Sequence, residues 1–319
     1  MDKVTIVIPN YNGCSMLDIC LESILKNNTL ETSIVVVDNG STDNSREMVK
    51  TKYPNVRFIE LDKNYGFCKA VNVGIKSAYT DYVLLLNNDI EIDALFVEKM
   101  YSAIRSSNKI FSVEACMIQY YKRSLIDSAG TFYNALGWAF ARGNGKAVER
   151  YSKSMKTFAT CAGAAIYRKS VFEEIGYFDD AHFAYLEDVD IGYRARLHGY
   201  INKYEAEARV FHMGSKTSGS KHNGFKVKHS VQNNIYLIYK NMPFIQIVIN
   251  FPFLLFGFLI KFMFFLLKGL GRDYAKGFVS GFRVAKQNHE KKVRIKPRMI
   301  GSIMKIQLEL WLNLVRRFS

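Results

Sequence analysis

The sequence has little of what marks secreted, disordered or repetitive proteins. Of its 319 residues only five are proline and five are cysteine, and no stretch rich in proline, glycine and serine indicates disorder. The cysteines are odd in number and scattered, without the spacing of a disulfide framework or a zinc site. The N-terminus lacks the basic start and long apolar run of a signal peptide. We therefore expect a globular protein with buried thiols, whose body stays in the cytosol.

Acidic residues are scarce near the C-terminus. Between Lys240 and Ser319 there are fifteen lysines and arginines against three acids, whereas the rest of the chain is nearly neutral. The same region contains the longest apolar run, Phe244–Leu267. A basic and apolar segment is typical of attachment to anionic lipid. A core helical hairpin with a solvated charged face is the alternative, and nucleic-acid binding would explain the charge but not the apolar run.

The apolar run has 24 residues, which is long enough for a membrane span of about 20 residues. Pro252 and Lys261 weaken that interpretation. Two amphipathic stretches follow, Tyr274–Gln287 and Met299–Arg317, in which basic residues alternate with large apolar ones. Such stretches suit helices that lie in the headgroup layer. We expect monotopic attachment, with a single span as the alternative.

The first ninety residues alternate between two patterns. Short apolar segments rich in β-branched residues are followed by stretches with the spacing of amphipathic helices. The expected strands are Val4–Ile8, Ser33–Val37, Val56–Leu61 and Tyr82–Leu86, and the expected helices are Met16–Lys26, Ser45–Tyr53 and Phe67–Ala78. This order predicts an α/β fold with a mostly parallel sheet. Because Val83–Leu86 is apolar at every position, helices are expected on both faces.

Polar residues follow three of the expected strands. They are Pro9–Asn12, Asp38–Asp43 and Asn87–Asp89. Each set alone could be ordinary turn chemistry, but ligands of open α/β sheets bind beyond the carboxyl ends of the strands, where all three sets would meet. A carboxylate at Asp89 suits Mg²⁺ or Mn²⁺ holding phosphates, since these ions prefer oxygen ligands.

Four segments together resemble the family 2 glycosyltransferases of the GT-A fold. They are Ile8–Asn12, Val35–Asp43, Asn64–Phe67 and Leu86–Asp89. The resemblance covers roughly residues 3–240. Within the family the chain is most similar to the rhamnosyltransferase-type branch that builds bacterial cell-surface polysaccharides.

The resemblance implies roles for individual residues. The nucleotide-sugar site would contain Pro9, Asn10, Asp38, Asn39, Gly66, Asn72, Asn87 and Asn88. Of these, Asp38 would contact the base, while Gly66 and Asn72 would lie near the ribose and diphosphate. Asp89 matches the last acid of the family's metal motif, and His212 can complete the metal site. Asn87 stands where the usual Asp-x-Asp motif has its first acid, so metal binding would be weakened.

A base for the acceptor hydroxyl is expected in the segment Tyr185–Asp190, which opens a helix running to His198. Acids in a first helical turn also have an ordinary explanation in the helix dipole. Asp190 can pair with Arg194 four residues later, which leaves Asp188 as the freer carboxylate. The resemblance implies that Asp188 removes the proton and that Glu187 shapes the acceptor site. A base opposite a metal-held diphosphate favours single displacement with inversion.

Several further residues are weaker candidates for substrate contact. His212 alone would more often be a packed residue, and Lys216 beside Gly214 suits phosphate binding. Trp138 is either a sugar-stacking residue or a packing anchor. Cys161 and Gly163 lie in a segment of small residues that allows close approach of a ligand or tight packing. No Gln-x-x-Arg-Trp sequence follows the Glu-Asp motif, so transfer is expected to be non-processive.

These observations predict three regions: residues 1–90 bind the nucleotide sugar, 91–240 form the acceptor-binding and catalytic half, and 241–319 attach to the membrane. The predicted enzyme transfers a sugar, by preference rhamnose from dTDP-rhamnose, to a lipid-linked saccharide at the cytoplasmic face of the cell membrane, with Mn²⁺ or Mg²⁺ and without nucleic acid. A UDP-sugar donor is one alternative. A sugar nucleotidyltransferase is another, but it would normally have a glycine-rich basic loop where this chain has Pro9–Gly13. A membrane scaffold without activity would leave Asp89 and Asp188 unexplained.

Overall fold

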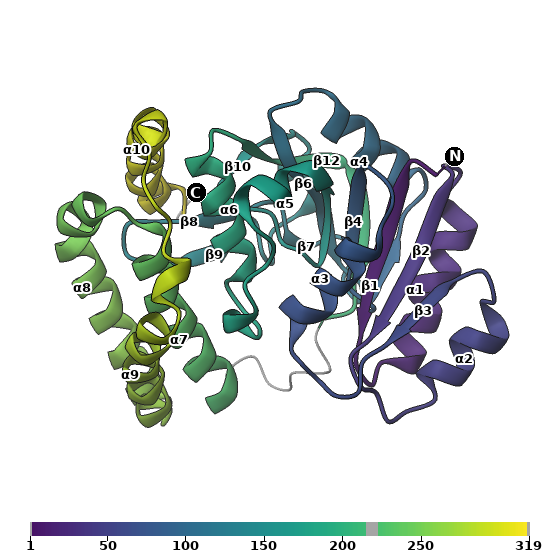
Figure 1. The fold of residues 1–319 in the computed structure, drawn as a ribbon, viewed down its shortest axis with the longest axis horizontal. Helices are drawn as coiled ribbons and strands as arrows, with labels where there is room; N and C mark the ends of the chain where they lie inside the picture. Colours follow the sequence, from purple (N-terminus) through teal and green to yellow (C-terminus); the bar gives the residue numbers. More distant parts are fainter. Residues whose placement is uncertain (1, 215–222, 318–319) are drawn as a thin grey trace.

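A computed structural model of the chain describes residues 2–214 and 223–317. A mixed β-sheet flanked by helices forms the larger part, and four long C-terminal helices stand together at one side of it (Figure 1). The predicted α/β fold with a C-terminal helical region is confirmed.

The elements follow the expected alternation. Up to residue 214 they are β1 (Val4–Asn10), α1 (Cys14–Asn27), β2 (Thr32–Asp38), α2 (Ser45–Lys52), β3 (Arg57–Glu60), α3 (Phe67–Ser77), β4 (Tyr82–Leu86), β5 (Ile90–Ile92), α4 (Phe96–Arg105), β6 (Ile110–Gln119), β7 (Ile126–Ser128), β8 (Thr131–Tyr133), β9 (Ala139–Ala141), η1 (Val148–Tyr151), β10 (Met155–Thr157), β11 (Ala164–Arg168), α5 (Lys169–Ile175), η2 (Asp180–His182), α6 (Glu187–Leu197) and β12 (Ile201–His212). The C-terminal elements are α7 (Gly224–Asn241), α8 (Phe244–Leu267), α9 (Gly271–Gln287), η3 (His289–Lys291), η4 (Pro297–Met299) and α10 (Ile300–Arg316).

The main sheet has the strand order β10-β12-β6-β11-β4-β1-β2-β3. Strands β4, β1, β2 and β3 are parallel, as the sequence predicts for its first ninety residues. Strand β11 runs antiparallel between β4 and β6, and β12 returns parallel to β6. The carboxyl ends of β1, β2 and β4 therefore meet at one edge of the sheet.

Alternate residues of β4 are buried on opposite faces of the sheet. Leu84 and Leu86 belong to a core packed by α1, α2 and α4. Val83 and Leu85 belong to a second core, packed by α3, α5 and α6. A strand covered on both faces must be apolar throughout, which explains the continuous apolar run.

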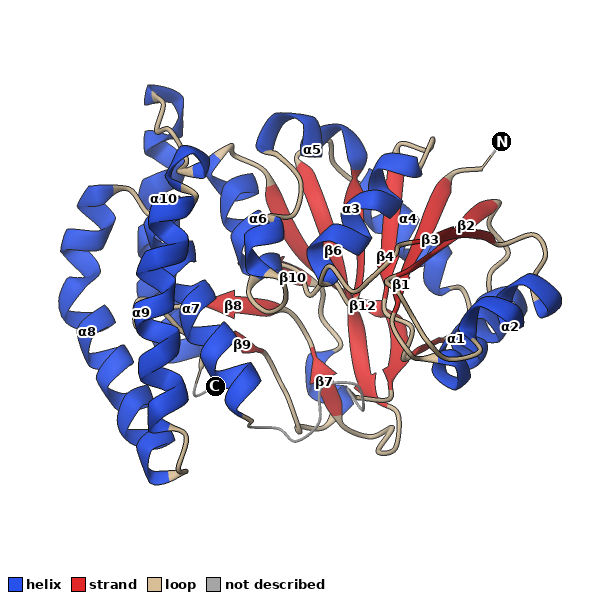
Figure 2. Ribbon diagram, turned by 60° about the horizontal axis from the view of Figure 1, so that its bottom comes forward, coloured by secondary structure: helices blue, strands red, loops and turns tan. Residues whose placement is uncertain are grey.

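Helix α8 packs on the rest of the protein through one narrow stripe. Its buried residues are Gln246, Asn250, Leu254 and Gly257, whose spacing of three to four puts them on one face. Asn250 exchanges hydrogen bonds of 2.8 and 2.9 Å with Gln307 of α10. Figure 2 shows α8 beside α10 and α9. Trp138, in the turn between β8 and β9, donates a hydrogen bond to the carbonyl of Gly257 in α8. The remaining surface of α8 carries exposed phenylalanine, leucine and isoleucine side chains.

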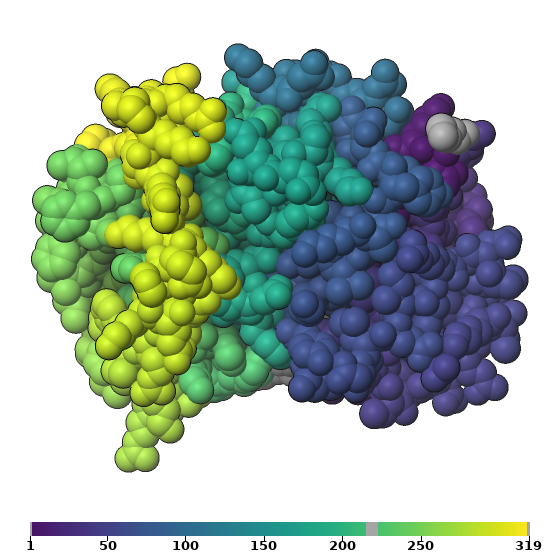
Figure 3. Space-filling model, viewed as in Figure 1, coloured from purple at the N-terminus to yellow at the C-terminus, as the bar shows by residue number. Residues whose placement is uncertain are grey.

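In the described part of the chain, α8 is the one helix that is long and apolar enough to cross a membrane, judged by length and composition. The mean hydropathy of its most apolar stretch is 2.1, and 17% of that stretch is buried. The segment after α9, coloured yellow in Figure 3, runs over the junction between the helical layer and the sheet-containing part. The C-terminal region is thus packed against the rest of the chain and still exposes an apolar face.

Candidate active site

A chain of hydrogen bonds joins the ends of three parallel strands. The amide of Asn88, after β4, donates to the side-chain oxygen of Asn10 in β1 at 2.7 Å. Asn10 in turn donates to Asp38 of β2 at 2.9 Å, and Ser41 donates to the same carboxylate. The three polar sets that the sequence places after these strands are therefore brought together, as predicted.

Asn39 fixes the loop before α3 in the same way. Its side chain donates to Asn64 at 3.0 Å and to the carbonyl of Gly66 at 3.1 Å, and it accepts from the amide of Tyr65. Gly66 has a φ of +86°, and a Cβ at this position would lie 2.6 Å from the carbonyl oxygen of Phe183. Only glycine permits this close approach of two loops.

These groups border an open cavity of about 780 Å³, within the usual size range of small-molecule sites. Its lining comes from strand ends and from loops of both halves of the chain: Pro9, Asn10, Tyr11, Asn39, Asn64, Gly66, Phe67, Asn87, Asn88, Asp89, Phe183, Ala184, Tyr185, Asn223 and Phe225. Most of the predicted nucleotide-sugar residues are among them. Asp38 stands behind Asn10 and orients it. Asn72 lies outside the cavity, because its amide is bonded to Phe178 and Asp180.

Asp89 and His212 lie side by side, although 123 positions separate them in the sequence. The Nε2 atom of His212 is 3.2 Å from Oδ2 of Asp89, and its Nδ1 atom is 2.8 Å from Oδ2 of Asp127. Burial alone would lower the pKa of His212, but hydrogen bonds to Asp127 and Asp89 raise it to about 10. Asp127 thus orients His212 toward Asp89, as a second carboxylate commonly does for a metal-binding histidine.

The residues around Asp89 fit a divalent cation. Its Oδ1 atom is buried and has no hydrogen-bond partner among the described residues, so an acceptor is available beside His212. No group of three or more His, Cys, Asp or Glu residues in the described ranges could hold a metal. A cation here would have Asp89 and His212 as protein ligands and would take its other ligands from water and phosphate oxygens.

The loop before α6 has unusual backbone geometry. Phe183, Tyr185 and Leu186 have positive φ values of 48°, 75° and 66°, a region that residues other than glycine rarely adopt. The amide of Asn233 on α7 donates to the carbonyls of His182, Ala184 and Tyr185 at 2.7, 2.8 and 2.9 Å. A C-terminal helix thus holds the loop that leads into α6.

Helix α6 begins with Glu187 and Asp188. Asp188 is partly exposed and accepts from the amide of Val189 at 2.7 Å. Burial raises the pKa of both carboxyl groups, and repulsion by Asp188 raises the pKa of Glu187 further. The Oε2 atom of Glu187 has no hydrogen-bond partner among the described residues. Neither carboxyl group lines the large cavity, although Tyr185, two residues before Glu187, does. Two neighbouring carboxyl groups with raised pKa values are typical of acid–base chemistry.

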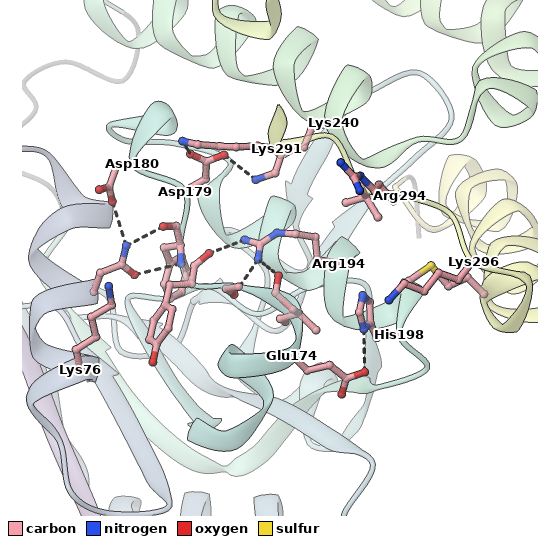
Figure 4. Close-up of a pocket in the computed structure, with 17 residues that line it drawn as sticks. Lys76, Glu174, Asp179, Asp180, Arg194, His198, Lys240, Lys291, Arg294 and Lys296 are labelled. Carbon is pink, nitrogen blue, oxygen red and sulfur yellow. Dashed lines mark hydrogen bonds and ion pairs between the residues drawn. The ribbon is translucent and has the colours of Figure 1, made fainter. Parts of the chain in front are cut away.

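Asp190 faces the other way and is fully paired. Arg194 lies 2.7 Å from its carboxylate and Lys240 of α7 lies 3.0 Å from it, all buried. The predicted Asp190–Arg194 pair is confirmed. Lys240 also lies 2.7 Å from Asp179, and Lys291 contacts the same carboxylate at 2.8 Å. Figure 4 shows Arg194, Lys240, Asp179 and Lys291 around a second cavity of about 570 Å³, between the 174–180 segment, α6 and the 291–299 segment.

The weaker candidates are placed in different surroundings. Cys161 donates its amide to the buried Glu114 at 2.9 Å, and the carbonyl of Gly163 accepts from the amide of Asn87 at 2.8 Å, so both lie beside the β4 end. Trp138 is remote from the large cavity and donates to the carbonyl of Gly257 in α8 at 3.2 Å. Lys216 lies outside the described residues.

Sequence reasoning missed several residues that the fold brings to the site. They are Tyr11, Asn64, Glu114, Asp127, Phe183, Tyr185, Phe225 and Asn233. Tyr11, Asn64 and Tyr185 lie within the motif segments Pro9–Asn12, Asn64–Phe67 and Tyr185–Asp190, so these motifs are a sequence signal that could have found them. Phe225 and Asn233 lie on α7, where no local pattern distinguishes a residue that faces the site from one that faces the helical layer.

Comparisons with known proteins agree with this geometry. A model of the glycosyl transferase family 2 matches residues 5–176. The N-acetylglucosaminyl-diphospho-decaprenol L-rhamnosyltransferase of Mycobacterium tuberculosis is 25% identical over 262 residues, which cover 74% of this chain and 84% of the relative. The poly-beta-1,6-N-acetyl-D-glucosamine synthase of Staphylococcus aureus is 25% identical over 221 residues, covering 69% of this chain and 52% of the synthase.

Solved structures share the fold. GalNAc-T7 with UDP, GalNAc and Mn²⁺ has a TM-score of 0.62 at 15% identity, over 75% of this chain and 48% of the other. The mannosyltransferase PcManGT of Pyrobaculum calidifontis, in complex with GDP-Man and Mn²⁺, has a TM-score of 0.55 at 13% identity, over 97% and 84% of the two chains. Staphylococcus aureus TarS 1–349 has a TM-score of 0.52 at 17% identity, over 98% and 85%.

Proposed function

The chain belongs to glycosyl transferase family 2, and on that premise we propose that it is an inverting, non-processive enzyme that moves rhamnose from dTDP-rhamnose to a lipid-linked saccharide in cell-surface polysaccharide synthesis. Its activity as a glycosyltransferase follows from the family. The proposal concerns the donor, the acceptor and the stereochemistry. It is carried by one observation: three strand ends joined around a cavity that borders the loop leading to Asp188.

The cavity supports a nucleotide diphosphate sugar as the donor. Its floor is made of neutral amides and the aromatic rings of Tyr11, Phe67 and Phe225, which suit a base and a ribose. Asp38 holds Asn10 in place and is not exposed in the cavity. Asp89 stands at the opposite end of this polar series, where a diphosphate would meet the Asp89–His212 pair.

Asp188 is the proposed general base. Its raised pKa keeps the carboxylate basic enough to accept the proton of an acceptor hydroxyl while still ionised near neutral pH. Attack by that hydroxyl on the anomeric carbon, with the nucleoside diphosphate leaving from the opposite face, inverts the configuration. Glu187 lies next to it and is proposed to bind the acceptor sugar.

Asp89 and His212 would hold the divalent cation, Mn²⁺ or Mg²⁺. When bound, such an ion neutralises the negative charge that develops on the leaving diphosphate. The orphaned Oδ1 atom of Asp89 and the two structural neighbours named with Mn²⁺ support this proposal. Asp127, which pairs with Nδ1 of His212, would orient the ring so that Nε2, once it has lost its proton, can bind the cation.

Two observations support a lipid-linked acceptor. The mycobacterial relative is named for a saccharide on diphospho-decaprenol. In this chain, the exposed apolar faces of α8, α9 and α10 and the surplus of basic residues suit the cytoplasmic surface of an anionic membrane. We propose monotopic attachment there, with a single span by α8 as the alternative.

The proposed function is tested in two steps. The melting temperature of the purified chain is measured with dTDP, UDP and GDP, each with and without Mn²⁺, since a ligand of the native state raises it. We expect the largest metal-dependent shift with dTDP. A larger shift with UDP would establish the alternative donor, and no shift with any nucleotide would contradict the donor site.

Asp188→Asn tests the base. It is expected to keep the nucleotide-induced shift and to lose about 10²- to 10⁴-fold in turnover. The matched control is Asp81→Asn, an exposed aspartate outside the site, which should leave turnover unchanged. Normal turnover in Asp188→Asn would remove this residue from the mechanism.

A further inference from the structure

A separate cavity of about 430 Å³ adjoins the proposed donor site. Tyr185 lines both cavities, so it forms the wall between them. Leu186, the residue before α6, also lines this cavity, and the rest of the lining comes from the β8–β9 hairpin and from α7, α8 and α9. Tyr185 and Leu186 directly precede Glu187 and Asp188, so this cavity leads from the C-terminal helices to the start of α6.

The most unusual member of this lining is Lys261. It is a cation in the middle of α8, where Phe258 and Phe265 are its neighbours on the helix face. Its Nζ atom lies 5.5 Å from the ring centre of Trp138, and the guanidinium of Arg317 lies 4.9 Å from the same ring. Within residues 2–214 and 223–317, neither cation has an ion pair with a carboxylate. Lys261 is partly buried and lines the cavity, whereas Arg317 is exposed and stands outside the lining. A partly buried cation among apolar side chains, without an acidic partner, indicates a place for an anion.

Close packing of α8 on the β8–β9 turn fixes Lys261 in this position. A Cβ at Gly257, one turn before Lys261, would lie 2.2 Å from the carbonyl oxygen of Leu136, so only glycine allows this contact. Trp138 donates to the carbonyl of Gly257, and Asn234 of α7 donates to the carbonyl of Gly137 at 2.8 Å. The turn is thereby held between α7 and α8, and the charge of Lys261 is directed along the turn rather than away from the protein.

Exposed apolar side chains of α8 follow the residues that line the cavity, since Phe264 directly precedes Phe265 of the lining. Phe264, three residues after Lys261, is 43% exposed, and Leu267 is 85% exposed. A ligand that reaches from this face to Tyr185 would meet apolar side chains first, then the cations, and then the catalytic loop. That order matches a molecule with a lipid chain, an anionic group and a sugar.

We propose that this cavity binds the lipid-linked acceptor, with Lys261, supported by Arg317, holding its diphosphate. The lipid chain would lie along α8 past Phe264 and Phe265, and the saccharide would pass Tyr185 toward Asp188. This inference rests on the proposed function, which it deepens by naming a prenyl diphosphate as the recognised part of the acceptor. A cation set between apolar side chains, as Lys261 is between Phe258 and Phe265, favours a diphosphate at the end of a lipid over a free soluble saccharide.

The test measures binding rather than transfer, so it is independent of the donor. Farnesyl diphosphate, farnesol and inorganic pyrophosphate are titrated into the full chain in detergent micelles by calorimetry, in the presence of dTDP and Mn²⁺. We expect farnesyl diphosphate to bind at least about tenfold more tightly than farnesol or pyrophosphate, because only it engages both the cations and the apolar wall. Excess nucleotide should not displace it.

Lys261→Met keeps the length and apolar stem of the side chain and removes its charge. Binding of farnesyl diphosphate should weaken by about tenfold, whereas Lys261→Arg should retain it. Lys305→Met, at an exposed lysine of α10, is the matched control and should bind like the wild type. Melting temperatures of the variants verify that they are folded.

Three results would overturn the proposal: equal affinity for farnesyl diphosphate and farnesol, unchanged affinity in Lys261→Met, or displacement by nucleotide, which would assign the binding to the donor cavity. Should Lys261→Met not fold, the wild-type preference for the diphosphate over farnesol and retained binding in Lys261→Arg still decide. If nucleotides do not raise the melting temperature but farnesyl diphosphate still binds, only the assignment of the donor site is contradicted.

Discussion

Three residues just before α6 hold backbone conformations that side chains of their type rarely adopt. Positive φ values at Phe183, Tyr185 and Leu186 cost on the order of 1–3 kcal/mol each. Such strain persists only where the surroundings determine it, and here Asn233 bonds to three carbonyls of the loop. Tyr185 lines both cavities, so this conformation would decide where Asp188, the proposed base, stands relative to the proposed donor and acceptor sites. Asn233 is therefore a positioning residue.

Replacing Asn233 by leucine is expected to lower kcat by more than about tenfold, because the loop loses three hydrogen bonds and relaxes. The nucleotide-induced rise in melting temperature should be reduced but retained, since the strand-end amides are untouched while Phe183 and Tyr185 line the same cavity. The measurement is kcat per folded enzyme together with that rise.

Asn250→Leu is the matched control for Asn233→Leu. It is another buried asparagine with several hydrogen bonds, but it joins α8 to α10. This variant should lose stability while its kcat per folded enzyme stays the same. An equal loss of kcat in both variants would mean that Asn233 has only a structural role.

At the scale of elements, the βαβ series and the strand-end residues could be predicted because both depend on local order in the sequence. Strand β4 is apolar at every position, and Asn87–Asp89 follow it directly. This pattern predicts that Asp89 lies at the carboxyl edge of the sheet. Asp127 and Asn233 could not be predicted, since their roles depend on contacts with His212 and with loop 182–185 across long stretches of chain. Asn72 is the opposite case. The family resemblance predicts that it contacts the donor, but its side-chain amide donates to the carbonyl of Phe178 and to Asp180 instead.

Buried charges connect the C-terminal helices to α6. Lys240 on α7 lies between Asp179 and Asp190, and all three side chains are almost fully buried. Burial alone would raise the pKa of both aspartates, but the cations hold these pKa values well below the usual range, through Lys240 for Asp179 and through Arg194 and Lys240 for Asp190. The helical layer and the helix that carries Asp188 are therefore expected to unfold together.

Lys240→Met should lower the free energy of unfolding by about 3–5 kcal/mol at neutral pH, because two carboxylates stay buried without that cation. Lys291→Met removes a cation from the same Asp179, but its side chain is 40% exposed, so it should cost only about 0–1 kcal/mol. Urea unfolding measures both values, and equal losses would contradict the importance of burial.

The difference in free energy of unfolding between the wild type and Lys240→Met is expected to depend on pH. Carboxylates with depressed pKa values stabilise the fold above their unfolded pKa of about 3.9, and this stabilisation is lost as the pH falls through the folded values. The gap between the wild type and Lys240→Met should therefore close toward acid pH. A gap that widens there would contradict the pairing.

For the whole molecule, the surplus of basic residues and the exposed apolar surface lie in the same region of the chain. The basic surplus lies after Lys240, in the same region whose helices expose most of the large apolar side chains. The sheet-containing part exposes few of them. This asymmetry gives the protein one side suited to a lipid surface, and the acceptor cavity proposed here reaches that side along α8.

We expect the purified chain to bind vesicles that contain phosphatidylglycerol, and to bind neutral vesicles more weakly because the basic side chains then contribute little. Phe256 and Leu259 of α8 are 61% and 51% exposed, so changing both to serine should not destabilise the fold. Each lost apolar contact with lipid is worth roughly 1.5–3 kcal/mol at full burial, and the double variant should partition at least about tenfold less. Leu25→Ser with Tyr79→Ser, at side chains 61% and 69% exposed on the other part of the molecule, is the matched control. Cosedimentation with vesicles measures all three proteins, and unchanged binding of the α8 variant would assign attachment to charge alone.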